Sequence, residues 1–285
     1  LFSYFFLPYP GNDLFLKSGD VNAPSYDNSS IQFYSNMRFP DKTISYKISD
    51  CPIKKTSDME DSFIILENLT SLNFYPVTDN EQVIITCSSE TRESEQNGFF
   101  IAGEGGPLNI TLTDNFNVIQ KGKILLLRDL KCENPNVGIH ELLHVLGFTH
   151  SQNPDSIMYE VSKCSQVITS DIVNEINRLY STSSLTDLVV NNLTASTHGR
   201  YLDVSFSVVN HGLKESEGAD AIILINEEEI ERILLNKLDI GYGTAINFKN
   251  LRLPFDKIEK ISVYVNYSNE ELNKKNNKIE LDVID

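Results

Sequence analysis

The spacing of hydrophobic and polar positions changes along the chain, and these changes predict its elements. Apolar and polar residues alternate in Thr43–Ile48, which predicts a strand. Residues 57–72 have helical spacing instead, and Ser57 and Glu60 are placed as in a capping box, so we expect a helix there. The apolar face of this helix would consist of Met59, Phe63, Leu66 and Leu69.

Apolar runs separated by turn residues predict the rest of the first half. We expect strands at residues 73–77, Val83–Cys87, 107–119 and Lys123–Leu127, with a turn at 120–122. A second helix would end at Gly147, and a last one would span residues 170–180.

After a plausible linker, Ser181–Leu185, the pattern becomes that of short strands. Seven β-rich runs in about 100 residues, separated by turns, are typical of an immunoglobulin-like sandwich. We therefore predict an irregular lead-in at 1–35, a first domain at 36–182 and an all-β domain at 186–285. The apolar start of the lead-in is either the tail of a removed signal or anchor segment, or a peripheral strand or loop.

Composition excludes some classes of function. The net charge of −16 argues against a nucleic-acid partner, which needs clustered Lys and Arg. No apolar run approaches the roughly 18 residues of a membrane span. The four cysteines form no C-x-x-C pair, and Cys51–Cys87 with Cys132–Cys164 would close loops in separate halves. Such disulfides would imply an extracellular or cell-surface location; free buried thiols are the alternative.

Three of the five histidines fall within one stretch of eleven residues. His140 and His144 are four apart, so a helix would place both imidazoles on one face. Gly147 can take the left-handed conformation that ends a helix, so His150 can approach the same point from another direction. Three imidazoles that leave a fourth position for water are the ligand set of a catalytic zinc ion. Glu141 is then the expected general base.

This stretch, HELLHVLGFTH, matches the long metzincin motif H-E-x-x-H-x-x-G-x-x-H. Ser151 follows the third histidine and Met158 lies eight residues beyond it, and both features resemble the matrixins, the matrix-metalloproteinase branch. The closing SDIVNEINRLY resembles their final helix. The resemblance implies an α+β fold with a twisted mixed sheet and long helices, and endopeptidase activity on protein or peptide substrates. It implies the zinc ligands His140, His144 and His150, the base Glu141 and the Met-turn residue Met158.

The chain also departs from the matrixin pattern. It has no histidine before His140 for the usual structural zinc, so we expect one catalytic zinc ion. The calcium sites of the family do not transfer residue by residue, so calcium stays unknown. Glu160 replaces the Pro that commonly follows Met-Tyr in the specificity-pocket wall, which leaves the peptide preference open. Substrate would add as a strand at a sheet edge, which we expect within Pro107–Gln120.

The second half resembles the CARDB family of adhesion-related, immunoglobulin-like domains. The residues that carry this resemblance are TDLVV, FSVVNHG and NEELNKKNNKIELDV. It implies a cell-surface or extracellular setting and a cell-surface partner bound through 186–285. The rival interpretation is a non-catalytic adhesion protein with a purely structural metal site, although such a site has no need of Glu141.

Overall fold

The computed structural model describes residues 31–92, 100–128, 132–254 and 257–282. They form two compact units that divide chiefly between Thr182 and Ser183, here called the N-terminal and C-terminal units. Residues 1–30 of the predicted lead-in, which include its apolar start, lie outside the described residues. That 36–182 and 186–285 are separate folding domains stays a prediction.

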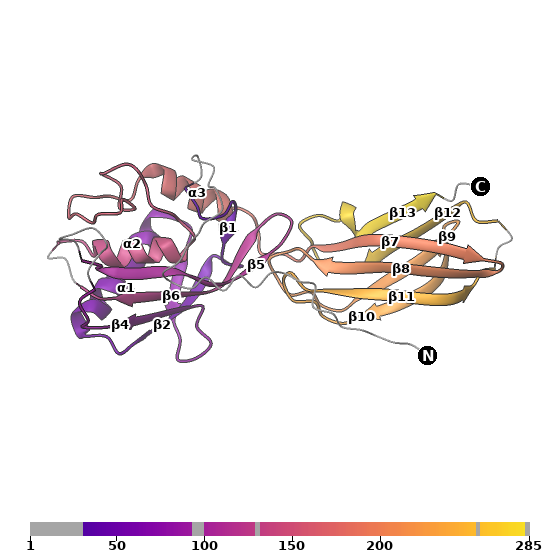
Figure 1. Ribbon diagram of the computed structural model, residues 1–285, viewed down its shortest axis with the longest axis horizontal. Coiled ribbons are helices and arrows are strands. Elements are labelled where there is room, and N and C mark those ends of the chain that lie inside the picture. The colour runs from indigo at the N-terminus through magenta and orange to yellow at the C-terminus, as the bar shows by residue number, and fades with distance from the viewer. Residues whose placement is uncertain (1–30, 93–99, 129–131, 255–256, 283–285) are drawn as a thin grey trace. The chain divides into compact units, whose positions relative to one another are not determined.

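The N-terminal unit is built on a six-stranded mixed sheet (Figure 1). Its strands are β1 (Met37–Arg38), β2 (Thr43–Ser49), β3 (Asn73–Pro76), β4 (Val83–Cys87), β5 (Gly103–Leu112) and β6 (Asn117–Leu126). The order is β1-β6-β4-β2-β3, with parallel pairing throughout. β5 forms a hairpin with β6 and pairs with no other strand among the described residues, so it is an edge strand.

Three helices accompany this sheet within the described ranges: α1 (Ile53–Leu69), α2 (Asn136–Val145) and α3 (Ser170–Tyr180). The expected long helices are not confirmed. α2 and α3 have 10 and 11 residues, and only α1, with 17, exceeds the usual length of about 11 to 12. α3 covers the predicted closing helix, and α2 contains the first two histidines of the motif.

α1 begins earlier than its sequence predicts. The Pro52 carbonyl already accepts a helical hydrogen bond from the Thr56 N–H at 3.0 Å, and no side chain caps the helix. The predicted capping box of Ser57 and Glu60 is therefore wrong, because both residues lie inside the helix. Three of the four predicted apolar-face residues are buried, and the fourth, Leu69 at the helix end, is 46% exposed.

The β5–β6 hairpin also differs from the prediction. Residues 113–116 connect the strands, whereas the predicted turn at 120–122 lies inside β6. A Cβ at Gly122 would lie 2.5 Å from Cγ1 of Val145 in α2. Close packing of strand on helix therefore explains this glycine, which the sequence alone presents as a turn residue.

Two disulfides brace the N-terminal unit. Cys51–Cys87 joins the residue before Pro52 to the end of β4, and Cys132–Cys164 joins the segments that precede α2 and α3. The predicted pairing is confirmed. No cysteine is free, which excludes the alternative of buried thiols.

The C-terminal unit is a β-sandwich of seven strands among the described residues, as predicted. They are β7 (Leu188–His198), β8 (Tyr201–Asn210), β9 (Ala219–Ile225), β10 (Glu228–Leu235), β11 (Gly243–Arg252), β12 (Lys260–Asn266) and β13 (Lys278–Asp282), with a short 3-10 helix, η1, at Lys275–Asn277. One sheet has the order β10-β9-β12-β13 and the other β11-β8-β7. Apolar residues of both sheets, such as Phe206 and Val263, form one core.

Across the described parts of both units, no helix has the length and apolar character needed to cross a membrane.

Candidate metal centre

α2 and the turn after it bring the three motif histidines to one point. His140 and His144 are 5% and 8% exposed, and their Nε2 atoms lie 3.0 Å apart. Gly147 has a φ of +95° and redirects the chain just beyond α2. Nε2 of His150 then lies 3.2 Å from Nε2 of His144. The three candidate ligand atoms are all within 4.8 Å of one another.

The outer nitrogens of the two helical histidines are held by backbone carbonyls. Nδ1 of His140 lies 2.7 Å from the Ile157 oxygen, and Nδ1 of His144 lies 2.8 Å from the Phe148 oxygen. Since a carbonyl can only accept, both Nδ1 atoms carry the proton, and each Nε2 presents a lone pair. This arrangement fixes the tautomer and ring orientation that a metal ligand needs.

The distances from Nε2 of His144 to the other two Nε2 atoms fit zinc. With Zn–N bonds of about 2.0 to 2.1 Å, tetrahedral geometry places two ligand nitrogens about 3.3 to 3.4 Å apart. The observed 3.0 and 3.2 Å are close to this value. Lone pairs that converge without protons between them repel one another, so a cation is the species that suits the cluster.

Burial also keeps the imidazoles neutral. It lowers the pKa of His140 to about 4 and, together with the neighbouring histidines, that of His144 to about 3. His150 is the exposed member of the three, and partial burial of its ring still lowers its pKa. All three are therefore unprotonated at neutral pH, the state in which an imidazole can coordinate a metal.

Glu141 lies against the edge strand β5. It is 6% exposed, and burial, followed by the charge of Glu104, raises its pKa to about 8. A Cβ at Gly103 would come 2.8 Å from Oε1 of Glu141, and one at Gly105 would come 2.3 Å from the Glu141 backbone oxygen. Two glycines therefore let β5 approach the helix at this residue. Sequence reasoning missed them, although the GEGG stretch carried the signal.

The Met158 turn supports the histidines through its backbone. Met158 is 1% exposed, and the Tyr159 N–H donates to the Ser156 carbonyl at 3.0 Å. The Met158 carbonyl accepts the Ser151 N–H at 2.8 Å, and the preceding Ile157 carbonyl contacts His140. The turn predicted from the sequence thus lies directly beside the candidate metal ligands.

The family model of the matrixins matches residues 38–181 of this chain. These residues make up about half of the chain and contain the whole of this site. The chain belongs to the matrixin family. Zinc metallopeptidase activity is the class of function that this membership supports, and the histidine cluster of this matrixin suits the metal. Comparison with curated proteins yields no match.

Several solved structures are similar to parts of this matrixin. A CARDB domain from Pyrococcus furiosus, in complex with di-metal ions, has 18% identity and a TM-score of 0.31, covering 35% of this chain and 87% of its own. High choriolytic enzyme 1, a hatching-enzyme zinc-protease from the medaka Oryzias latipes, has 22% identity and a TM-score of 0.26. The match covers 45% of this chain and 55% of that enzyme's chain. Myroilysin has 10% identity and a TM-score of 0.35, and the match covers 55% of this chain and 89% of the myroilysin chain. The family assignment rests on the matrixin match.

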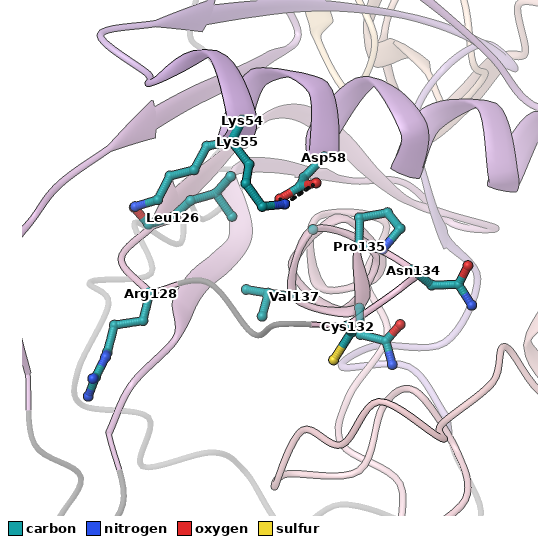
Figure 2. Close-up of a pocket in the computed structure, with 11 residues that line it drawn as sticks. Lys54, Lys55, Asp58, Leu126, Arg128, Cys132, Asn134, Pro135 and Val137 are labelled. Atoms are coloured by element: carbon teal, nitrogen blue, oxygen red, sulfur yellow. Dashed lines mark hydrogen bonds and ion pairs between the residues drawn. The ribbon is translucent and has the colours of Figure 1, made fainter.

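A separate small pocket lies beside the first turn of α2 (Figure 2). Lys54 and Asp58 of α1 form an ion pair at its wall, and Val137 and Cys132 line the other side. Lys55 donates to three backbone carbonyls at 2.9 to 3.3 Å, so its charge is already used in holding α1 to the end of β6. None of the motif histidines lines this pocket.

Proposed function

We propose that this matrixin is an exported zinc endopeptidase of the matrix-metalloproteinase branch. Its zinc ligands would be His140, His144 and His150, with Met158 in the turn that supports them. The observation that carries the proposal is the convergence of three neutral Nε2 atoms, two of them fixed by carbonyls behind them. The ligand set leaves a coordination position for water or substrate.

Glu141 would be the general base. Zinc bound by the three histidines would act as a Lewis acid toward the scissile carbonyl. Glu141 would accept a proton from the attacking water and deliver it to the leaving amine. Its side chain extends from α2 toward the backbone of β5, the edge proposed to bind the peptide. A nearby cation favours the ionised carboxylate that a base requires.

The substrate would be a protein or peptide that adds as a strand to β5. The stretch predicted for this edge, Pro107–Gln120, contains the second half of β5 but also the start of β6, which pairs with β1. We therefore place the proposed binding edge in β5, Gly103–Leu112. The side of β5 that pairs with no strand in the described parts of the chain can offer backbone hydrogen bonds to an extended peptide.

The proposed setting is extracellular or on the cell surface. Both disulfides favour an oxidising compartment, because such bonds are rare in the reducing cytosol. The likeness of the C-terminal unit to a CARDB domain motivates a cell-surface partner for residues 186–285. The rival, a non-catalytic adhesion protein, is not favoured, since a closed structural site uses four protein ligands and the described cluster has three.

Two variants test the proposed roles separately. Glu141→Gln keeps the shape of the side chain but cannot accept a proton, so zinc should stay at one ion per chain while kcat falls by about 10²- to 10⁴-fold. His144→Ala removes a ligand and should lose zinc and activity together. Metal content and peptide cleavage would be measured on both. Wild-type cleavage by zinc-loaded Glu141→Gln would refute the mechanism.

A further inference from the structure

We propose that Glu160 selects peptides with a basic side chain close to the scissile bond. The inference rests on the proposed peptidase function and adds a substrate preference to it. It starts from the position where this chain has a carboxylate directly after the Met158–Tyr159 pair.

The backbone holds Glu160 beside the metal centre. Ser151, the residue after His150, pairs with Tyr159 in a parallel bridge, and its N–H donates to the Met158 carbonyl. Glu160 directly follows this bridge, one residue beyond the partner of Ser151. The carboxylate does not belong to the group of ligand atoms that lie within 4.8 Å of one another. It is thus near the ligands without being one of them.

The segment after Glu160 is also fixed. Gln166 is 3% exposed, and its Oε1 accepts the Lys163 N–H at 2.8 Å. Its Nε2 donates to two carbonyls, one of them that of Val161, the neighbour of Glu160, at 3.0 Å. The disulfide at Cys164 ties the same segment to the start of α2. Sequence reasoning did not single out Gln166. Because the backbone is held on both sides, little of it needs to become ordered when a ligand binds.

The charge of Glu160 is available to a substrate. The side chain is exposed, and it forms no ion pair with any residue that the structure describes. The net charge of −16 adds a long-range attraction for cationic peptides. An exposed ion pair of this kind favours a lysine or arginine over an uncharged side chain by about fivefold, which corresponds to about 1 kcal/mol.

The test uses the full zinc-loaded chain and a peptide set with one variable residue. Lysine, norleucine or glutamate is placed in turn at each of the three positions on either side of the scissile bond. Wild type should prefer lysine at one position at least. In Glu160→Gln the ratio of kcat/KM for lysine over norleucine should fall about fivefold there, and Glu160→Lys should favour glutamate. Asp79→Asn, an exposed carboxylate between β3 and β4 at the far edge of the sheet, should keep the wild-type ratio.

The outcomes separate this inference from the function on which it rests. If zinc-loaded wild type cleaves none of the peptides, the proposed function fails. If wild type cleaves them without preferring lysine, or if Glu160→Gln cleaves with the wild-type ratio, the selectivity of Glu160 is refuted and the peptidase stands. Zinc content of each variant is measured in parallel, and a loss of zinc from Glu160→Gln would show that the carboxylate supports the metal site, which also overturns the proposal.

Discussion

Replacing Gly105 by alanine tests the contact between the edge strand β5 and α2, the helix that carries the proposed base Glu141. An added Cβ would lie 2.3 Å from the Glu141 backbone oxygen and 2.9 Å from its Cα and carbonyl carbon. Carbon atoms in contact prefer about 3.5 to 4.0 Å, so β5 and α2 would have to separate by roughly 1 Å. Backbone atoms stand on both sides, so no side-chain rotation can relieve the overlap. We expect the free energy of unfolding to fall by about 1–3 kcal/mol.

The same displacement should reduce hydrolysis, because a misplacement of about 1 Å near the reacting groups costs on the order of 10²-fold in rate. Two neighbouring glycines provide graded comparisons. Gly103→Ala would press on Cγ and Oε1 of Glu141, which can rotate, so it should lower kcat with a smaller loss of stability. Gly106→Ala meets no atom within 4 Å and should leave both quantities unchanged.

Urea denaturation and peptide cleavage on the three zinc-loaded variants would measure these effects. The expected order of stability loss is Gly105, then Gly103, with Gly106 showing none. If Gly105→Ala were as stable and as active as wild type, β5 would not lie against Glu141 as described, and the account of this site would be wrong.

Three further results are expected. Replacing Cys132 and Cys164 by serine should lower the free energy of unfolding by about 2–4 kcal/mol in denaturant titrations, and an unchanged midpoint would contradict the bracing role. Burial raises the pKa of Tyr180 to about 12 from the ordinary 10, so stability should fall as the pH rises from 10 to 12, by up to about 1.4 kcal/mol per pH unit from this group, and Tyr180→Phe should weaken this dependence in alkaline melts. A chain that ends at residue 185 should cleave short peptides nearly as fast as the full chain; a folded, zinc-loaded but inactive product would show that the proposed domain boundary is misplaced.

The sequence was sufficient where a feature depends on local spacing. Two imidazoles four residues apart must share a helix face, and Gly147 has the conformational freedom that the turn toward His150 requires. The strands of the C-terminal unit follow from alternation and turn residues for the same reason. The disulfide pairing could also be predicted from the sequence. Four cysteines allow only three pairings, and each half of the unit holds two of them.

The errors arose where tertiary packing overrides a local signal. Ser57 and Glu60 have the spacing of a capping box, yet the helix already starts after Pro52, next to the disulfide at Cys51. The sequence presents Gly122 as a turn residue, yet it lies inside β6. A glycine is needed there because Val145 leaves no room for a side chain. In both cases the residue type has two explanations, and only a distant part of the chain decides between them.

The candidate metal site shows why possible ligands can be predicted from a sequence while the groups that support them cannot. The groups that orient His140 and His144 are the carbonyls of Ile157 and Phe148, and any residue type could supply a carbonyl there. The glycines of β5 act through the absence of a side chain, so their role depends entirely on what lies opposite. Gln166 acts through an amide that many surface residues also carry. Catalytic chemistry demands particular side chains and leaves a motif, whereas the positioning of those side chains here relies on backbone atoms and close approach, which only the folded chain brings together.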